Sequence, residues 1–330
     1  MKIVRFCQPG PPSVLEYIDA PIPSLKDGEV LVRANYIGVG IPDVLIRSGL
    51  YGWMPPLPAV PGTEMSGTIE KVGRGVTSLK NGQRVIVSAR ERKHRGGCYA
   101  EYNATPAESV FALPDDADLE QAAALANYQV AYHLLNDCVR PESGQSVLVY
   151  GAAGGVGSAI IDLAVAAGLE VIAVCSGATK VEFVKSLGAH VIIDRREQDV
   201  AEGVRVATKG RQADLILDPI GGPRFTDNFA MLAPFGLVVS YGRLAGQPAG
   251  DVMGTLVGNS GKCGAVRIFS MHVFDEWPEK RRQGMRWLIE RLGEGAIRPR
   301  IHGLLLLSEA RKAHEMLEGG EITGKLLLRP

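Results

Sequence analysis

The feature that most constrains this chain is a glycine-rich turn between two apolar runs, within residues 146–177. The first five residues of this stretch are apolar and rich in β-branched side chains, which is typical of a buried parallel strand. Several glycines follow within Gly151–Gly157, and a small, apolar run from Val156 with Gly168 behind it predicts a helix. Residues 171–174 read as a second strand. The stretch therefore predicts a strand, a tight turn, a helix and a strand, as in a βαβ unit.

The turn itself has the chemistry of a phosphate-binding site. The first N–H groups of a helix have no partner within the helix, and they lie at the positive end of its dipole. Against the pattern G-x-G-x-x-G, the turn reads Ala152-Ala153-Gly154-Gly155-Val156-Gly157, with alanine at the first glycine. The remaining glycines let a pyrophosphate approach the backbone and let the helix pack closely on the strand. Because strands and a helix flank the turn, we expect a dinucleotide to bind at Gly154–Gly157.

The residues after the second strand indicate which dinucleotide would bind. A carboxylate there would bind the ribose 2′-hydroxyl of NAD and repel the 2′-phosphate of NADP. This chain instead has Cys175, Ser176 and Gly177, then Lys180 one turn on, and Arg195 and Arg196 after the next predicted strand. A hydroxyl and several cations favour a phosphate, so we expect NADPH. In the alternative interpretation, Lys180 lies on an outer helix face and the two arginines are merely solvated.

Beyond the glycine turn, strand and helix signals alternate. Buried strands are predicted over 191–193, 213–217, 237–240 and 265–269, and helices over 178–187, 199–208 and 224–232. Six strands alternating with helices predict a doubly wound parallel sheet.

The first 120 or so residues show a different pattern of secondary-structure signals. Short β-like runs over 30–34, 65–72 and 84–87 are separated by Gly, Pro and Asn, which predicts an irregular, mostly β domain. The proline-rich segment 53–62 can be neither a helix nor a central strand. Asp118, with Gln121 three residues later, predicts the start of a helix that links this domain to the next one.

The last 55 or so residues contain both helix and strand signals. The predicted elements are an amphipathic helix over 277–292, a strand over 301–307, a helix over 309–318 capped by Ser308, and a strand over 323–328. Because a six-strand sheet does not need these elements, we expect the tail to complete the first domain.

Composition excludes several classes of function. The formal net charge is zero, so nothing indicates affinity for nucleic acid or an anionic membrane. The dense basic run at Arg90–Arg95 is interpreted as a solvated loop. We find no secretory signal and no apolar run of about 18 residues. The five cysteines are far apart, which suits a reducing compartment, so we expect a cytoplasmic protein.

Several segments resemble the medium-chain dehydrogenase/reductase superfamily, and most of all its zinc-free quinone oxidoreductase branch, which includes zeta-crystallin. The segments that carry the resemblance are IRSGLY (46–51), PGTEMSGTIEKVG (61–73), GGCYAEY (96–102), NYQVAY (127–132), VLVYGAAGGVG (147–157), LGAHVI (187–192), AHEMLE (313–318) and TGKLLL (323–328). The resemblance implies an α/β protein in which a GroES-like partial β-barrel accompanies a Rossmann doubly wound parallel sheet. It implies a GroES-like catalytic domain of residues 1–122 and 271–330, and a Rossmann NADP(H)-binding domain of residues 123–270.

The resemblance also implies which residues bind the cofactor. The phosphate-contacting turn falls on Gly154, Gly155, Val156 and Gly157, and the 2′-phosphate site falls on Ser176, Lys180 and Arg196. The positions that line the nicotinamide, or lie near it, fall on Asn127, Tyr128, Tyr241, Gly242, Phe269, Ser270 and Lys325. Tyr128 and Tyr51 are the only side chains we nominate as catalytic proton donors, and the alternative for each is a packing role. Protonation by water would need neither.

Two positions argue against zinc. The zinc alcohol dehydrogenases that the chain resembles carry a Cys and a His where this sequence has Gly40 and Thr63, and the four-cysteine zinc lobe is absent. The six histidines show no paired spacing, so no metal is expected. The chain also departs from the quinone-reductase pattern, because Gly40 and Leu45 replace the usual Asn and Tyr. That departure puts the acceptor in question more than hydride transfer.

Three functional hypotheses follow. The first is NADPH-dependent reduction of a quinone, and the second is reduction of the activated C=C bond of an alkenal or enone. The third is non-catalytic, either a crystallin-like nucleotide-binding protein or an RNA-binding protein, and the neutral charge disfavours the RNA version. We expect a small-molecule substrate, no nucleic-acid or membrane partner, and a homodimer that pairs through the strand at 265–269. The alternative is a monomer whose edge is shielded by the loop at 251–263.

Overall fold

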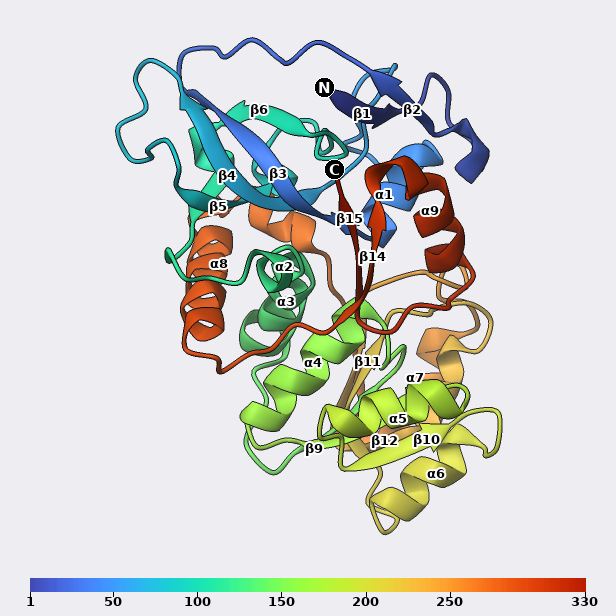
Figure 1. Ribbon diagram of the computed structural model, residues 1–330. Coiled ribbons are helices and arrows are strands. Elements are labelled where there is room, and N and C mark those ends of the chain that lie inside the picture. The colour runs from blue at the N-terminus through green and yellow to red at the C-terminus, as the bar shows by residue number, and fades with distance from the viewer. The chain divides into compact units, whose positions relative to one another are not determined.

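The computed structural model describes residues 1–330, and the chain divides into two compact units. The first unit comprises Met1–Ala126 and Pro278–Pro330, and the second comprises Asn127–Trp277. The tail of the chain therefore returns to the unit that the amino-terminal residues form (Figure 1). The two units are described separately.

The second unit is built on a six-stranded sheet in the order β10-β9-β8-β11-β12-β13. Its strands are β8 (Ser146–Val149), β9 (Glu170–Cys175), β10 (Val191–Asp194), β11 (Ala213–Asp218), β12 (Leu232–Ser240) and β13 (Ala265–Ile268). Every pairing is parallel. The chain winds outward from β8 to β10 and then returns to β11 on the other side of β8. This reversal is the topological switch point at which doubly wound sheets bind ligands.

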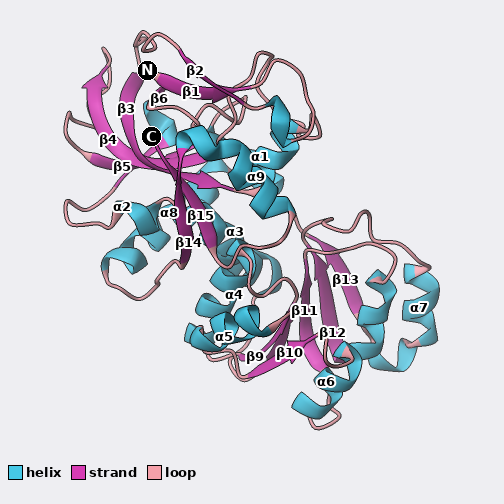
Figure 2. Cartoon of the chain, turned by 45° about the vertical axis from the view of Figure 1, so that its right-hand side comes forward, coloured by secondary structure: helices cyan, strands magenta, loops and turns pink.

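Helices cover both faces of this sheet, and Figure 2 shows α4 and α5 on one face and α6 on the other. The α-helices of the unit are α3 (Leu125–His133), α4 (Gly155–Ala166), α5 (Ala178–Ser186), α6 (Val200–Ala207) and α7 (Val252–Gly258). The first two residues of α3 belong to the first unit. A π-helical turn, Leu134–Val139, continues α3. Burial of apolar strand residues such as Leu148, Ile172 and Val238 against Phe225 and Phe229 forms the core.

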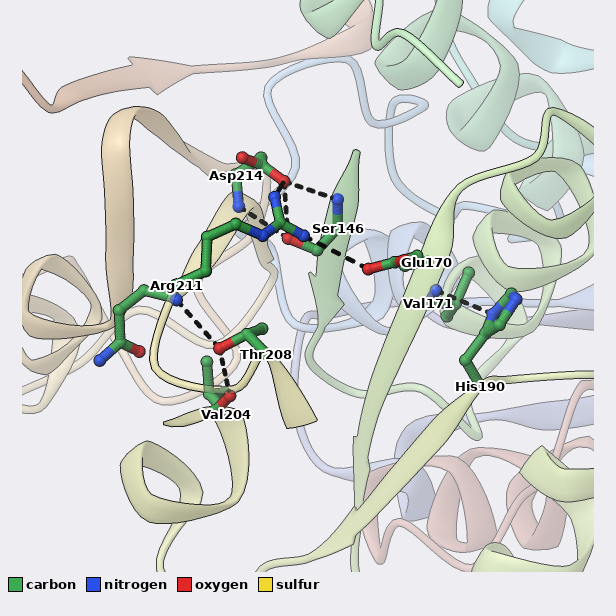
Figure 3. A network of polar contacts seen from close by, with 9 residues as sticks. Ser146, Glu170, Val171, His190, Val204, Thr208, Arg211 and Asp214 are labelled. Carbon is green, nitrogen blue, oxygen red and sulfur yellow. Dashed lines mark hydrogen bonds and ion pairs between the residues drawn. The ribbon is translucent and has the colours of Figure 1, made fainter. Parts of the chain in front are cut away.

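A polar network ties together the amino-terminal ends of β8, β9 and β11 (Figure 3). The Asp214 carboxylate accepts hydrogen bonds of 2.7 Å from both the backbone N–H and the hydroxyl of Ser146. Arg211 donates to Asp214 at 2.8 Å and to Glu170 at 3.3 Å. The Val171 N–H donates to Nδ1 of His190 at 3.1 Å. These bonds satisfy polar groups at the edge of the sheet opposite the glycine turn.

The first unit is built on a seven-stranded sheet in the order β14-β15-β3-β4-β5-β7, with β6 paired to β3. Its strands are β3 (Glu29–Val39), β4 (Glu64–Val72), β5 (Arg84–Ser88), β6 (Tyr102–Pro106), β7 (Val110–Ala112), β14 (Ile301–Leu306) and β15 (Lys325–Arg329). All pairings are antiparallel except that of β14 with β15. A separate antiparallel hairpin joins β1 (Lys2–Arg5) to β2 (Glu16–Asp19).

The α-helices of the first unit are α1 (Ile41–Arg47), α2 (Leu119–Ala122), α8 (Pro278–Gly293) and α9 (Ala310–Glu318). Asp118 caps α2 as expected, because its carboxylate accepts from the N–H groups of Glu120 and Gln121. The amphipathic pattern of α8 is confirmed, since Met285, Leu288, Ile289 and Leu292 are buried. None of the helices in the structure is both long and apolar enough to cross a membrane.

A clamp centred on the buried Arg47 joins α1 to α9. The Arg47 guanidinium makes two hydrogen bonds to Glu318, at 2.8 and 2.9 Å, and faces Nδ1 of His314 at 3.2 Å. Because arginine only donates, this Nδ1 must accept, and the opposite nitrogen therefore donates to the Tyr99 hydroxyl at 3.1 Å. Burial, together with the Arg47 charge, lowers the pKa of His314 to about 3. The clamp brings together two of the segments that carried the family resemblance, residues 46–51 and 313–318.

The helical stretch expected at 224–232 is the 3₁₀ helix Phe225–Met231. Four other expectations from the sequence are wrong. The expected loop at 251–263 contains α7. The strand at 265–268 is not buried; it is the sheet's edge strand, and Ile268 is 73% exposed. Ser308 lies inside a 3₁₀ turn, and Glu309 is the N-cap of α9. The basic run is not a solvated loop, because Arg95 is buried and the Glu91 side chain is only 2% exposed.

Candidate functional site

The glycine turn lies at the carboxyl end of β8, directly before α4. Gly151 has a φ of +61°, a backbone conformation that L side chains rarely adopt. A Cβ on Gly157 would lie 2.8 Å from the Cα of Ala152 and closer still to the Gly151 carbonyl oxygen, so only glycine fits there. Gly154 is the N-cap of the twelve-residue α4 and has no side chain to fill the space in front of the helix. The turn therefore presents backbone N–H groups of the first helical turn, as an anion site requires.

The predicted 2′-phosphate residues gather at the ends of the next two strands. Ser176 and Gly177 follow β9, and Lys180 lies in the first turn of α5. The Arg196 guanidinium lies against this turn, with Nη1 3.1 Å from the position that a Cβ of Gly177 would take. Its place is set by Asp194, whose carboxylate accepts from the N–H groups of Gly177 and Arg196, both at 3.0 Å.

The local sequence did not identify Asp194 as a positioning residue. Its backbone hydrogen bonds lower the pKa of its carboxyl, so it is ionised beside the basic side chains. The signal that could have found it is an acidic residue at the end of one strand when the neighbouring strand in the sheet is followed by a glycine, here Gly177. That signal depends on strand order, which one sequence does not reveal.

The predicted nicotinamide residues follow the last two strands. Tyr241 and Gly242 come directly after β12, and Phe269 and Ser270 come directly after β13. The Tyr241 N–H donates to the Asp218 carbonyl at 2.9 Å, and the Phe269 N–H donates to the Ser240 carbonyl at 2.9 Å. A Cβ on Gly242 would lie 2.6 Å from the Pro219 carbonyl oxygen, so the turn after β11 packs directly on this glycine.

Asp218 organises the turn after β11, and sequence reasoning missed it. Its carboxylate accepts from the N–H groups of Ile220 (2.6 Å) and Gly221 (3.1 Å) and from the Asn228 amide (3.0 Å). Burial raises its pKa, and the three donors oppose this shift. The residue thus fixes a loop at the carboxyl edge beside the switch point between β8 and β11.

Asn127 and Tyr128 lie near the start of α3. The Tyr128 ring is buried, and its hydroxyl donates to the Asp162 carboxylate of α4 at 2.6 Å. The hydroxyl proton is thus held in a short bond within the second unit. This geometry suits a residue that positions the two helices better than one that releases a proton.

In the first unit, Lys325 at the start of β15 forms a buried ion pair with Glu64 at the start of β4. The two side chains are 3% and 5% exposed. The other Glu64 oxygen accepts from the Ala126 N–H at 3.1 Å. Nearby, the fully buried Asp43 accepts from the N–H groups of Gly40 (2.8 Å) and Gly62 (3.2 Å).

Burial and a nearby cation shift the pKa of Asp43 in opposite directions. Burial raises the pKa of Asp43 to about 7, and the Lys325 ammonium limits the rise. A Cβ on Gly40 would lie 3.6 Å from that ammonium. The position at which the zinc relatives carry cysteine therefore lies beside a cation in this chain.

Tyr51, the other nominated donor, lies in the loop after α1. Its ring is 5.8 Å from that of Trp53, and the Arg95 guanidinium lies 4.9 Å from the Trp53 ring centre. Tyr51, Asp43 and Lys325 belong to the first unit, whereas the glycine turn and the predicted phosphate residues belong to the second.

Comparison with known proteins places both units in one family. Residues 26–115 match the alcohol dehydrogenase GroES-like domain, and residues 155–281 match the zinc-binding dehydrogenase family. The whole chain is 32% identical to a quinone oxidoreductase of Pseudomonas aeruginosa and covers 99% of that protein. The chain is a medium-chain dehydrogenase/reductase. It falls in the quinone oxidoreductase branch, which confirms the resemblance and the expected fold class.

Two further relatives of this medium-chain reductase are informative. The crystal structure of Escherichia coli quinone oxidoreductase complexed with NADPH has a TM-score of 0.90 and 29% identity, and the match covers 100% of both chains. A synaptic vesicle membrane protein VAT-1 homolog of Danio rerio is 33% identical over 93% of this chain. The chain spans 65% of that protein's length.

Proposed function

We propose that this medium-chain reductase binds NADPH and transfers hydride to a quinone or a similar conjugated carbonyl acceptor without a metal. The observation that carries the proposal is the glycine turn before α4, which lies at the switch point of a parallel sheet and has basic side chains at the end of the next strand. The NADPH complex of the E. coli relative supports the choice of cofactor.

In this proposal the cofactor's phosphates are bound by the second unit. The first N–H groups of α4, at Gly155, Val156 and Gly157, hold the pyrophosphate in front of Gly154. Ser176, Lys180 and Arg196 hold the 2′-phosphate. The residues after β12 and β13, namely Tyr241, Gly242, Phe269 and Ser270, line the nicotinamide half, together with Asn127 and Tyr128.

The chemistry divides between the cofactor and water. Bound NADPH supplies a hydride, and a proton from water completes the reduction of the acceptor to a quinol or saturated carbonyl. No dedicated acid is then needed, which agrees with the Tyr128 hydroxyl being held by Asp162. Tyr51 remains the nominated hydrogen-bond donor to the acceptor oxygen, where negative charge develops.

Zinc independence is supported by the residues at the expected ligand positions. Gly40 and Thr63 replace the cysteine and histidine, and the residues described include no group of three or more His, Cys, Asp or Glu side chains suited to a metal. The Lys325 ammonium, next to Gly40, would repel a divalent cation. We therefore propose that the Lys325 ammonium neutralises the charge of the Glu64 carboxylate at this position. This role differs from the predicted one, in which Lys325 contacts the cofactor.

One observation favours the alkenal or enone reductase as a second candidate. Gly40 and Leu45 replace the Asn and Tyr of the quinone-reductase pattern, so the acceptor side of the first unit lacks two polar groups.

A homodimer is also proposed. The exposed outer edge of β13, with Ile268 73% exposed, offers unpaired backbone groups to the same strand of a second copy.

The decisive measurement is binding of NADPH and NADH to the wild type and to Arg196→Gln, followed by fluorescence. One lost charge-assisted hydrogen bond to the phosphate is worth about 1.5 to 3 kcal/mol, so NADPH affinity should fall roughly tenfold or more while NADH affinity is unchanged. Lys185→Gln, an exposed lysine on the same helix as Lys180, is the matched control and should change neither. Equal affinity of the wild type for both nucleotides would contradict the assignment.

Turnover with a quinone and an enone, both in the presence of EDTA, separates the catalytic candidates. Oxidation of NADPH by the quinone supports the first function, and oxidation by the enone alone supports the second. Tight binding of NADPH without turnover by either acceptor would favour the non-catalytic class.

A further inference from the structure

The loop after β5 brings several guanidinium groups into the first unit. Arg90 lies in the 3₁₀ turn Ala89–Glu91, and Arg92 and Arg95 follow in the loop. Arg95 is 4% exposed, as is Arg281 of α8. Buried arginines are rare unless they are paired, so each of them needs an identified partner.

Glu91 accounts for the arginines of α8. Its side chain is 2% exposed and accepts two hydrogen bonds from Arg281, at 2.7 and 2.9 Å. Arg282 donates to the same carboxylate at 3.2 Å and to the Glu108 carbonyl at 3.0 Å. The single buried carboxylate of this loop is therefore already engaged by two guanidinium groups.

Neutral groups hold the next two arginines. Arg92 donates to the Gly96 carbonyl at 3.0 Å and to the Asn103 amide oxygen at 2.8 Å. The Arg95 guanidinium lies over the Trp53 ring at 4.9 Å, and the Arg95 N–H donates to the Trp53 carbonyl at 2.7 Å. A carbonyl, an amide or an aromatic ring satisfies a cation in part but does not neutralise its charge.

Arg90 has neither a carboxylate nor one of these neutral groups as a partner. Its terminal nitrogen Nη1 is buried and has no hydrogen-bond partner, which is also true of Nε of Arg92. An unsatisfied, buried and charged donor is among the most costly groups that a protein can retain. A group of this kind calls for an explanation, and an acceptor supplied by a ligand is one.

The surrounding charges favour an anion. Burial lowers the pKa of Arg90, the cations Arg95 and Arg281 lower it further, and Tyr51 and Glu64 act in the opposite direction. Glu64 is already paired with Lys325. Glu91 is engaged by Arg281, and Glu64 is engaged by Lys325, so neither of these carboxylates is left to pair with Arg90.

We propose that Arg90 is a specificity-determining residue that binds a carboxylate on the acceptor, so that the substrate is an anionic conjugated carbonyl compound. This inference rests on the proposed function for the identity of the reaction. The ring of the nominated donor Tyr51 lies 5.8 Å from that of Trp53, and Arg95 of the Arg90 loop lies over the same Trp53 ring at 4.9 Å, so this loop and the nominated donor share one part of the first unit. Trp53, beside Tyr51, adds an apolar ring for the conjugated part of the acceptor.

The test uses an anionic acceptor and a neutral one with the same conjugated skeleton, 4-oxopent-2-enoate and its methyl ester, with NADPH. The wild type should reduce the acid with a kcat/KM at least tenfold higher than the ester. Arg90→Gln should lower kcat/KM for the acid at least tenfold, mainly through KM, and leave the ester unchanged. Arg90→Lys keeps the charge and should retain part of the preference. Lys93→Gln, an exposed cation of the same loop, is the matched control and should change neither value.

Two readouts separate this inference from a structural role and from failure of the proposed function. Thermal unfolding should show that Arg90→Gln is as stable as the wild type or more stable, because an uncompensated buried cation is removed. Equilibrium titration with 4-oxopent-2-enoate in the presence of NADP⁺ should show binding to the wild type that Arg90→Gln weakens at least tenfold, even if no turnover occurs. If neither acceptor is reduced but this binding is found, the proposed function fails and the anion site stands.

Three results would overturn the inference. Equal kcat/KM for acid and ester in the wild type would remove the charge preference. A loss of stability in Arg90→Gln with equal loss of activity toward both acceptors would assign Arg90 to the fold. Competition by inorganic phosphate without any binding of the carboxylate would assign the site to a different anion.

Discussion

Substitution of Gly157 by alanine tests the packing on which the dinucleotide site depends. Gly157 is buried in the first turn of α4, where the helix crosses the carbonyl of Gly151. A Cβ at this position would lie 2.8 Å from the Cα of Ala152 and closer still to the Gly151 oxygen. Both neighbours are backbone atoms of the turn, so no side chain can rotate away to make room.

The size of the effect follows from two opposing contributions. Alanine is favoured over glycine within a helix by up to about 1 kcal/mol. An extra carbon in a filled site typically costs about 1 to 3 kcal/mol, and occasionally more. Because the clash is with rigid backbone, the upper part of that range applies, and we expect a net loss of about 2 kcal/mol. In a unit of this size such a loss lowers Tm by roughly 4 to 8 °C.

Gly154→Ala is the matched control. A Cβ on Gly154 meets only the Gly151 oxygen, at 3.3 Å, and the φ of −77° is open to alanine. We therefore expect Gly154→Ala to change Tm little but to weaken NADPH binding, because the methyl group stands where the pyrophosphate approaches. Gly157→Ala should reduce both Tm and affinity. Calorimetry and fluorescence titration measure the two quantities, and a Gly157→Ala protein with wild-type Tm would refute the packing argument.

Three further predictions concern titratable side chains. Lys325→Met leaves Glu64 as a buried, uncompensated carboxylate, so urea titration should show a loss of about 3 to 5 kcal/mol in the free energy of unfolding. Adding Glu64→Gln should restore most of this loss, and an unchanged urea midpoint in Lys325→Met would contradict the argument. Burial opposes ionisation of Asp214, but the hydrogen bonds from Ser146 and a neighbouring arginine outweigh it and lower the pKa. Its contribution to stability is therefore full above about pH 4 and is lost at lower pH, so Asp214→Asn should flatten the acid limb of the Tm–pH curve. The folded-state pKa of His314 is about 3, so between that pH and about 6.5 the unfolded chain binds a proton that the folded chain does not. Stability should fall with decreasing pH by up to roughly 1.4 kcal/mol per unit, and His314→Gln should show a smaller slope across this window.

The glycine turn could be predicted because its requirements are local. A strand of apolar residues, a position of positive φ at Gly151 and a close approach at Gly157 are all set within a dozen residues of sequence. The cap at Asp118 and the apolar face of α8 follow for the same reason, since each depends on neighbours within one or two helical turns. Family resemblance then supplied the fold of the first unit, which its irregular strands alone did not specify.

The supporting carboxylates could not be predicted, because their partners are distant in sequence or depend on strand order. Asp194 binds the turn after β9 only because β10 lies beside β9 in the sheet. Asp43 accepts from the N–H of Gly62, 19 positions away. The strand at 265–268 carries an apolar pattern but lies at the sheet edge, so composition alone overstated its burial. In each case the missing information is tertiary.

The basic run at residues 90–95 shows how this limit bears on function. Local charge density predicts solvent exposure, yet Glu91 binds Arg281 from 190 positions away and the loop is drawn into the unit. One carboxylate engages two arginines of α8, but it does not explain Arg90, whose Nη1 has no acceptor. A fold selected for stability alone would replace such a group, because an uncompensated buried cation opposes folding. Arg90 breaks a local rule without a compensating contact within the protein, and positions of this kind are expected to be functional. The failure of the sequence-based expectation and the proposed anion site therefore have the same physical origin.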